Sequence, residues 1–250
     1  MPWCPVLIRR LCAAMLASSL LCASGAGCSR DDGDPGTDLR VGARLPDGEV
    51  LALDGRVVRL AQRVGRGVAV IVLGNFTCPG FRGHVPALEA LAAHYRGGAS
   101  FVMLYLRESH PTDGGGPDAV LRGTVGVCML QPTTDAERIA NARNFVAVER
   151  WTIPTLAVPM DEVVLRELMP PGSPMRLIIV EDGVVRYRSR FGYIDVDAAD
   201  AWLADRFPSL PHPAAYVRAL HPAAAGTGPI AGPLPDGPRR TATVPAPPPR

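Results

Sequence analysis

The chain has 250 residues, of which 47% are apolar, with 26 glycines, 26 prolines and a formal net charge of +2. So small a charge, without a basic cluster interleaved with aromatic residues, excludes nucleic acid as an expected partner. The length allows one or two domains, and the high glycine and proline content indicates that part of the chain lies outside any packed core.

Residues 1–28 are expected to form a targeting segment. Arg9 and Arg10 precede an apolar run, Leu11 to Leu21, that is short for a membrane span. Small residues follow and end at Cys28, which resembles the lipidated cysteine at the end of a bacterial lipoprotein signal. We therefore predict export to the cell envelope and a membrane anchor at Cys28. Ordinary signal cleavage and an uncleaved anchor helix are the alternatives.

One folded domain, residues 39–208, is predicted between a polar tether at residues 29–38 and a tail at residues 209–250. Proline, alanine and glycine dominate the tail, which cannot bury enough surface to offset its ordering entropy, so we expect it to be disordered. The domain holds two of the six cysteines, Cys78 and Cys128, too few for a disulfide scaffold. One nucleophile with one partner thiol is the better interpretation.

Strand and helix patterns alternate inside the domain. An Asp54-Gly55 turn predicts an N-terminal β-hairpin, and Thr134 with Glu137 forms a capping box at a helix start. This order is typical of an α/β thioredoxin-like fold, with a mixed sheet flanked by helices. The predicted elements are a hairpin within Val41–Leu60, strand Val68–Leu73, helix Pro79–Tyr95, strand Phe101–Leu106, a helix capped by Thr134 that carries Ile139, Ala142 and Val146, strand Thr155–Val158, helix Glu162–Met169, a hairpin of Arg176–Val180 and Val184–Tyr187, and helix Asp197–Phe207.

Cys78 follows a buried strand and precedes a helix whose first residue is Pro79. Proline suits that position because its missing N–H would have had no partner. We expect the thiol to face free backbone N–H groups and the positive end of the helix dipole, which favour thiolate and lower the pKa. The carboxyl end of a central strand is also where α/β sheets place active sites. The alternative is a buried structural cysteine.

Two stretches resemble the iodothyronine deiodinase family. Asn75-Phe76-Thr77-Cys78-Pro79-Gly80-Phe81 is similar to the family's active-site stretch, where selenocysteine follows Thr and precedes Pro-Pro-Phe. Leu104-Tyr105-Leu106-Arg107-Glu108-Ser109-His110-Pro111-Thr112-Asp113-Gly114 is similar to its second signature, an apolar strand that ends in Glu-x-His-x-x-Asp-Gly. The stretch from Pro174 through the following hairpin resembles the family's terminal hairpin. The likeness spans roughly Val41 to Phe207.

The resemblance implies roles for individual residues. Cys78 takes the selenocysteine position, and Glu108 and His110 take the catalytic acid-base positions, with Glu108 orienting the imidazole of His110. Thr77 and Pro79 support the active site. Pro174 is implied to be a cis-proline that packs against Cys78, with Ile153-Pro154-Thr155 as a look-alike. Cys128 is either a resolving thiol or a small buried hydrophobe.

The implied activity is reductive dehalogenation by a cysteine nucleophile, acting on a small molecule such as an iodinated aromatic. An external thiol reductant or a thioredoxin-like protein is expected as partner, with no bound cofactor or metal, and a homodimer is typical of the family. Two other functions stay open. One is an envelope thiol peroxidase or disulfide reductase, and the other is a non-catalytic thioredoxin-fold lipoprotein that binds a partner. His84 and His94, on the helix after Cys78, are expected to be solvated.

Overall fold

The structure is a computed structural model that describes residues 39–114, 127–161, 163–168, 175–190 and 192–221. Its strands are β1 (Glu49–Ala52), β2 (Val57–Arg59), β3 (Val68–Gly74), β4 (Ala99–Tyr105), β5 (Thr155–Ala157), β6 (Arg176–Glu181) and β7 (Val184–Arg188). Its helices are α1 (Leu60–Val64), α2 (Pro79–Tyr95), α4 (Asp135–Val148), α5 (Val163–Leu168), α6 (Val196–Arg206) and α7 (Ala214–Leu220).

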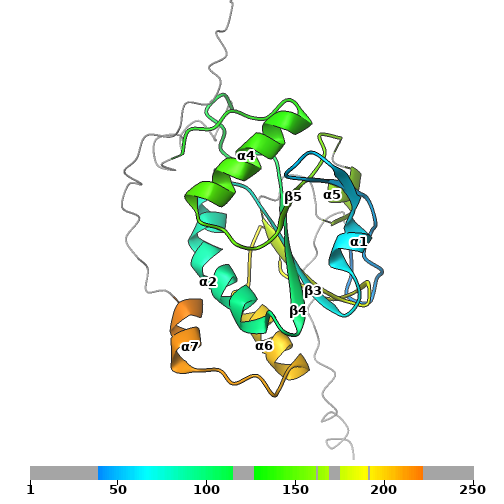
Figure 1. Cartoon of the computed structure of the whole chain (residues 1–250), viewed down its shortest axis with the longest axis vertical. Coiled ribbons are helices and arrows are strands. Elements are labelled where there is room, and N and C mark those ends of the chain that lie inside the picture. Colours follow the sequence, from blue (N-terminus) through cyan, green and yellow to red (C-terminus); the bar gives the residue numbers. More distant parts are fainter. Residues whose placement is uncertain (1–38, 115–126, 162, 169–174, 191, 222–250) are drawn as a thin grey trace, which may run out of the picture. The chain divides into compact units, whose positions relative to one another are not determined.

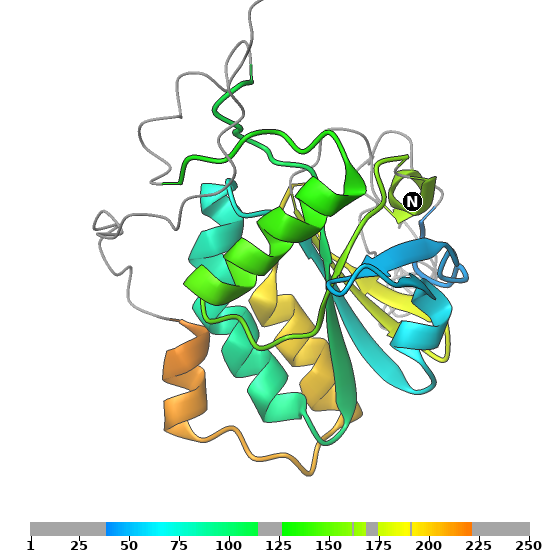
Figure 2. The same ribbon diagram turned by 45° about the horizontal axis from the view of Figure 1, so that its top comes forward.

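The strands form one mixed sheet in the order β2-β1-β5-β4-β3-β6-β7. The central strand β3 runs parallel to β4 and antiparallel to β6. Figures 1 and 2 show α2, α4 and α6 on one face of the sheet and α1 and α5 on the other. This confirms the predicted α/β thioredoxin-like fold, and it puts the carboxyl ends of β3 and β4 side by side.

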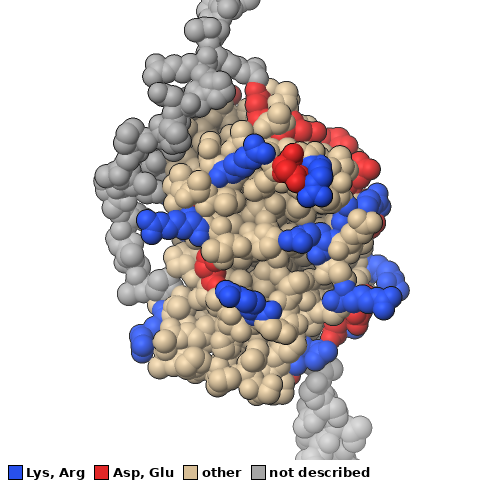
Figure 3. Space-filling model, viewed as in Figure 1, with Lys and Arg blue, Asp and Glu red and all other residues tan. Residues whose placement is uncertain are grey.

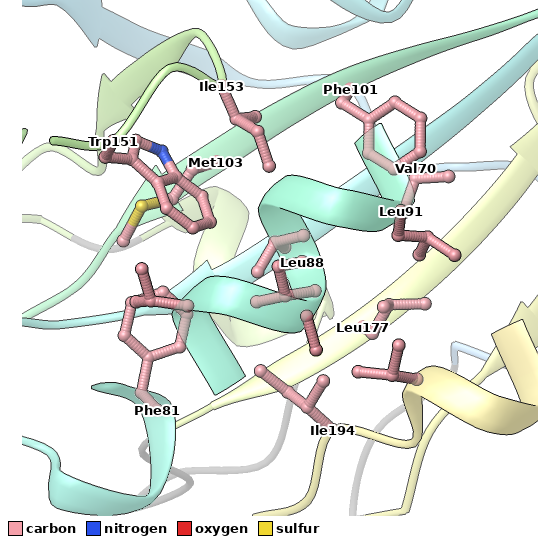
Figure 4. Packing of buried hydrophobic residues seen from close by; sticks show 14 of the residues in the cluster. Val70, Phe81, Leu88, Leu91, Phe101, Met103, Trp151, Ile153, Leu177 and Ile194 are labelled. Carbon is pink, nitrogen blue, oxygen red and sulfur yellow. The ribbon is translucent and has the colours of Figure 1, made fainter. Parts of the chain in front are cut away.

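The core follows the alternation of side chains along the central strands. On β3, Val70 and Val72 face the layer of α2, whereas Ala69, Ile71 and Leu73 face the opposite layer. Because both faces are covered, all seven residues of β3 are buried, as the continuous apolar run predicted. Figure 4 shows the apolar face of α2 against the sheet, with Phe81, Leu88 and Leu91 among side chains from β3, β4 and β6.

The element boundaries bear out most of the sequence predictions, and the exceptions are local. Helix α2 has the predicted bounds, whereas the short helix α1 starts at Leu60, the last residue of the stretch predicted as a hairpin, where no helix was expected. At the start of α4 the Thr134 hydroxyl accepts the predicted hydrogen bond from the Glu137 N–H at 3.2 Å. The Glu137 carboxylate, however, accepts from the N–H and hydroxyl of Thr133 at 2.8 Å, one residue earlier than a capping box requires.

The prediction that disorder begins at residue 209 is wrong for the part of the tail that the structure describes. Helix α7 lies against α2 (Figure 1) because it buries Tyr216 and Leu220 in the same core. The Tyr216 ring stacks on His94, with ring centroids 3.8 Å apart, so the expectation of a solvated His94 is also wrong. Residues 222–250 lie outside the described residues.

The surface over α2 and α4 is largely uncharged. Figure 3 shows basic side chains on this face separated from one another by uncharged surface. Among the helices that the structure describes, none is long and apolar enough to span a membrane. The predicted targeting segment, including Cys28, and the tether lie outside the described residues.

Candidate active site

Cys78 occupies the N-cap of α2, at the carboxyl end of β3. Its sulfur accepts a hydrogen bond from the backbone N–H of Phe81 at 3.4 Å, and Pro79 is the first helical residue, as predicted. Gly74 ends β3, and its bare Cα lets the ring of Phe81 pack on the strand: a Cβ there would lie 2.3 Å from Phe81 Cδ2. The first turn of α2 is thereby held close to the sheet, and with it the sulfur.

The predicted lowering of the Cys78 pKa is wrong for this structure. The residue is only 4% exposed, and burial raises the pKa of its thiol. Hydrogen bonds from the backbone N–H groups of Phe81 and Gly80 act in the opposite direction, as the helix position suggested, and so does a hydrogen bond from the Ser109 side chain. The negative charge of Glu108 adds to the effect of burial. The resting site therefore holds a thiol rather than a thiolate at neutral pH.

Glu108 is a buried carboxylate, 2% exposed, that joins β4, α4 and the turn before Cys78. Its Oε2 accepts from the backbone N–H of Thr77 at 3.1 Å and from the Thr77 hydroxyl at 2.9 Å. Its Oε1 accepts from the Tyr105 hydroxyl at 2.5 Å and from Nδ2 of Asn141 at 3.2 Å. Burial raises the pKa of Glu108, although these hydrogen bonds oppose the change.

His110 lies half-buried just beyond Glu108 and is tied to the same turn. Its backbone N–H donates to the Thr77 hydroxyl at 3.0 Å, and that hydroxyl in turn lies 2.9 Å from Glu108. Thr77, the residue that precedes Cys78, therefore contacts both predicted acid-base residues. The contacts described for the Glu108 carboxylate reach Thr77, Tyr105 and Asn141, and its link to the His110 backbone runs through the Thr77 hydroxyl.

Cys128 lies at the surface, in a segment that pairs with the residues after His110. The N–H and hydroxyl of Thr112 both donate to the carbonyl of Met129, at 2.8 and 3.1 Å. Met129 and its counterpart Val127 point into the core, whereas Cys128 between them is exposed. The alternative of a small buried hydrophobe is therefore wrong. Cys78 and Cys128 are both free thiols.

Met175, the residue before β6, lies next to Gly80 in the first turn of α2, close to Cys78. A Cβ on Gly80 would be 3.0 Å from the Met175 methyl and 3.9 Å from the Cys78 sulfur. Pro174, the predicted cis-proline, lies outside the described residues. His84, expected to be solvated, has its Nδ1 2.7 Å from the carbonyl oxygen of Gly80 and its ring against Tyr193.

The sequence motifs located Cys78, Thr77, Glu108 and His110, but not the polar side chains that hold them. The missed residues are Asn75, Tyr105, Ser109, Gln131 and Asn141. Asn75, Tyr105 and Ser109 lie inside the two motifs, but nothing in the sequence pattern assigned them a role. Asn141 lies on α4 and Gln131 in the segment before it. Both contact Glu108 only because the fold places these segments beside the end of β4.

A hollow lies at the other end of the sheet from Cys78. Arg44, Gly65, Arg66 and Asp182 line it, near the start of β3 and the turn between β6 and β7. Cys78 follows the opposite end of β3, so this hollow is separate from the candidate active site. Within the described part of the chain no group of His, Cys, Asp and Glu side chains is arranged to hold a metal ion.

Comparison with known proteins agrees with this geometry. The family model for iodothyronine deiodinase matches residues 36–204. The chain belongs to the iodothyronine deiodinase family. A 78-residue stretch is 33% identical to thyroxine 5-deiodinase of Gallus gallus, and the match covers 30% of this chain and 30% of that protein. Family and fold together support a thiol oxidoreductase.

Solved structures resemble the fold at low sequence identity. A thiol:disulfide interchange protein from Bacteroides sp. is 13% identical with a TM-score of 0.47, over 67% of this chain and 90% of that chain. Peroxidoxin BcpB of Mycobacterium tuberculosis is 16% identical with a TM-score of 0.46, over 69% of this chain and 99% of that chain. Likenesses this distant assign no activity.

Proposed function

We propose that the protein is a cysteine-dependent reductive dehalogenase of the deiodinase family, with an iodinated aromatic compound as the class of substrate. The observation that carries the proposal is the meeting of two motifs at one end of the sheet. Thr77, next to the candidate nucleophile Cys78, contacts both Glu108 and the backbone of His110. Family membership over residues 36–204 supports the same chemistry.

In the proposed reaction the Cys78 thiolate attacks iodine on the aromatic ring. The sulfur–iodine bond forms as the carbon–iodine bond breaks, and the electron pair of that bond stays on carbon, which takes up a proton. The products are the dehalogenated ring and a Cys78 sulfenyl iodide. One external thiol then displaces iodide and forms a mixed disulfide, and a second external thiol releases Cys78 as a thiol with formation of the reductant's disulfide. The external thiol thus supplies both electrons.

His110 is proposed as the group that moves protons in this cycle. An imidazole has one nitrogen that can accept a proton and one that can donate, so His110 can take up the Cys78 proton and deliver a proton to the carbon. The chemistry needs such a base because burial raises the pKa of Cys78. Glu108 is proposed to keep Thr77 and the His110 segment in place through its four hydrogen bonds.

Burial of the sulfur has a use in this scheme. A sulfenyl iodide hydrolyses readily, and a site closed to bulk water protects it until the thiol reductant arrives. At 4% exposure Cys78 lies in such a site. Export to the cell envelope, with an anchor at Cys28, is proposed as the setting of the reaction.

Halide release from an iodinated phenol in the presence of dithiothreitol tests the proposal. We expect release by the wild-type chain, none above background by Cys78→Ser, and a residual rate by His110→Ala. Ser100→Ala, a serine on β4 that contacts the carbonyls of Val64 and Val68, serves as a control with unchanged release. Undiminished release by Cys78→Ser refutes the proposal.

A second candidate function uses the same thiol on a peroxide or a disulfide. The exposed position of Cys128, in the segment paired with Thr112, favours it because an accessible second thiol suits disulfide-forming chemistry. Turnover of hydrogen peroxide with a thiol reductant, without halide release from the iodinated phenol, would establish this function instead.

A further inference from the structure

Tyr193 places an exposed aromatic ring against the helix that begins after Cys78. The residue is 49% exposed and lies in the loop between β7 and α6, the helix beside α2 in Figures 1 and 2. Its ring packs edge-to-face with the His84 ring of α2, with ring centroids 6.2 Å apart and an interplanar angle of 86°. The proposed reaction uses neither of these two rings.

Hydrogen bonds hold the Tyr193 backbone in place. The hydroxyl of Ser189, a residue that is 1% exposed, donates to the Tyr193 carbonyl at 2.5 Å and accepts from the Leu177 N–H of β6 at 2.9 Å. The Tyr193 N–H donates to the Arg190 carbonyl at 3.3 Å. Because Ser189 ties Tyr193 to the sheet, the exposed ring is preorganised, which lowers the entropy cost of binding a ligand against it.

The His84 imidazole is oriented by the first turn of α2. Its Nδ1 lies 2.7 Å from the Gly80 carbonyl oxygen, which can only accept, so the hydrogen is assigned to Nδ1. In the neutral ring Nε2 is then an acceptor. Within the part of the chain that the structure describes, no hydrogen bond uses Nε2. This atom is therefore available to accept from a ligand hydroxyl.

Gly80 connects the two rings to the reactive sulfur. A Cβ on Gly80 would lie 3.9 Å from the Cys78 sulfur, and the Gly80 carbonyl holds His84. The Met175 methyl lies 3.0 Å from the position of that Cβ, and a methionine side chain is flexible enough to make way for a ligand. An aromatic compound held against His84 and Tyr193 therefore lies beside the turn that carries the sulfur.

We propose that Tyr193 and His84 form the surface that binds the phenol ring of the substrate next to Cys78. The Tyr193 ring packs on the substrate ring, and His84 Nε2 accepts a hydrogen bond from the substrate hydroxyl. The class of ligand is thus a hydroxylated aromatic compound rather than an aliphatic halide. The proposal rests on the proposed function, because it names the part of the substrate that the chain recognises.

Equilibrium binding to the full chain carrying Cys78→Ser tests the proposal without turnover. The probes are 2-iodophenol and 2-iodoanisole, whose methyl ether oxygen has no hydrogen to donate to His84. Isothermal titration calorimetry should show the phenol binding about three- to tenfold more tightly than the anisole. His84→Phe keeps a ring against Tyr193 but removes the acceptor, so the two probes should then bind equally.

Substitutions at Tyr193 examine the ring contact. Tyr193→Leu should weaken the binding of both probes about three- to tenfold, whereas Tyr193→Phe keeps the ring and should change it less than about twofold. With Cys78 intact, Tyr193→Leu should raise KM for halide release more than it lowers kcat. His221→Phe changes a histidine at the end of α7, and it serves as the control with unchanged binding. Circular dichroism shows whether each variant is folded.

The absence of 2-iodophenol binding by the Cys78→Ser chain overturns the proposal, and so does equal affinity for the two probes with His84 in place. A loss of binding in His221→Phe as large as that in Tyr193→Leu overturns it too, because it would show a general structural effect. Expected binding without iodide release by the wild-type chain contradicts the proposed function alone. Iodide release with an unchanged KM in Tyr193→Leu contradicts the binding surface alone.

Discussion

One oxygen of the Glu108 carboxylate accepts both donors of Thr77, the backbone N–H at 3.1 Å and the hydroxyl at 2.9 Å. The pair joins the end of β4 to the residue that precedes Cys78, across 31 positions of sequence. Because Glu108 is almost fully buried, water does not replace these contacts when they are lost. Loss of these hydrogen bonds should therefore both destabilise the domain and release the residue that positions Cys78.

Glu108→Gln is expected to destabilise the domain. A glutamine amide placed in either orientation puts its NH₂ against a donor, either the N–H of Thr77 or the Nδ2 of Asn141. A buried donor left without its acceptor costs about 1–3 kcal/mol, so the free energy of unfolding should fall by that amount. Urea denaturation measures it, with Glu167→Gln on the exposed side of α5 as the control. A loss no larger than that of the control would contradict the prediction.

Much of the fold was predictable because its signals are local. The apolar run of β3 and the apolar stripe of α2 each lie within one stretch of sequence, and both elements were found. Helix α7 was missed because proline and alanine dominate its surroundings, while its docking depends on only two side chains, Tyr216 and Leu220. No periodicity over seven residues separates such a helix from a tail.

Gly74 and Gly80 flank Cys78 and should respond differently to an added methyl group. A Cβ at Gly74 would lie 2.3 to 2.6 Å from three atoms of the Phe81 ring, which is packed inside the core. A Cβ at Gly80 would lie 3.0 Å from the end of the flexible Met175 side chain. Gly74→Ala should therefore lower the free energy of unfolding by about 1–3 kcal/mol, and Gly80→Ala by much less.

Thermal and urea denaturation of the two glycine variants provide the comparison. Both substitutions add the same group, and only Gly80 lies in a helix, where alanine has the better intrinsic propensity. Helix propensity and the flexible Met175 side chain both favour Gly80→Ala, so the loss of stability in Gly74→Ala is what reports the packing at Phe81. Equal stabilities of the two variants would show that the Phe81 ring is free to move away from β3.

The sequence predicted which residues form the site, but not the direction of the pKa shift of its thiol. Cys78, Glu108 and His110 carry motif signals, and the helix position of Cys78 gave the correct backbone donors. The predicted direction of the Cys78 pKa shift was wrong because the sequence does not report how deeply a side chain is buried. The same reason hides Asn75 and Ser109, whose roles depend on the contact between two strand ends.

The two described cysteines should differ in reactivity toward a general alkylating reagent. Cys128 is exposed, whereas Cys78 is 4% exposed and burial raises its pKa. In the native chain at pH 7, iodoacetamide should modify Cys128 at least about tenfold faster than Cys78. Peptide mapping by mass spectrometry follows each site separately. In urea the two rates should converge, and faster native modification of Cys78 would show that its sulfur is more accessible than the structure describes.

The docking of α7 should weaken in mild acid. His94 stacks on Tyr216, and burial lowers its pKa below the usual 6.5, with a further contribution from the charge of His212. Asp200 of α6 opposes this change and accepts from the hydroxyls of Tyr95 and Tyr216. The undocked state therefore binds more protons than the docked state. Docking is fully stable above pH 6.5 and loses stability as the pH falls through the lowered pKa.

Hydrogen exchange of residues 214–220 measures this effect. Between pH 7.5 and 5.5 we expect protection factors in α7 to fall roughly three- to tenfold, while those of β3 stay constant. His94→Phe keeps a ring to stack on Tyr216 but does not titrate, so most of the pH dependence should vanish. If α7 loses protection equally in His94→Phe, the acid response belongs to another group, such as His212 or the His221–Asp197 pair at 3.4 Å. If α7 keeps its protection at pH 5.5 in the wild-type chain, then protonation of His94 does not compete with docking.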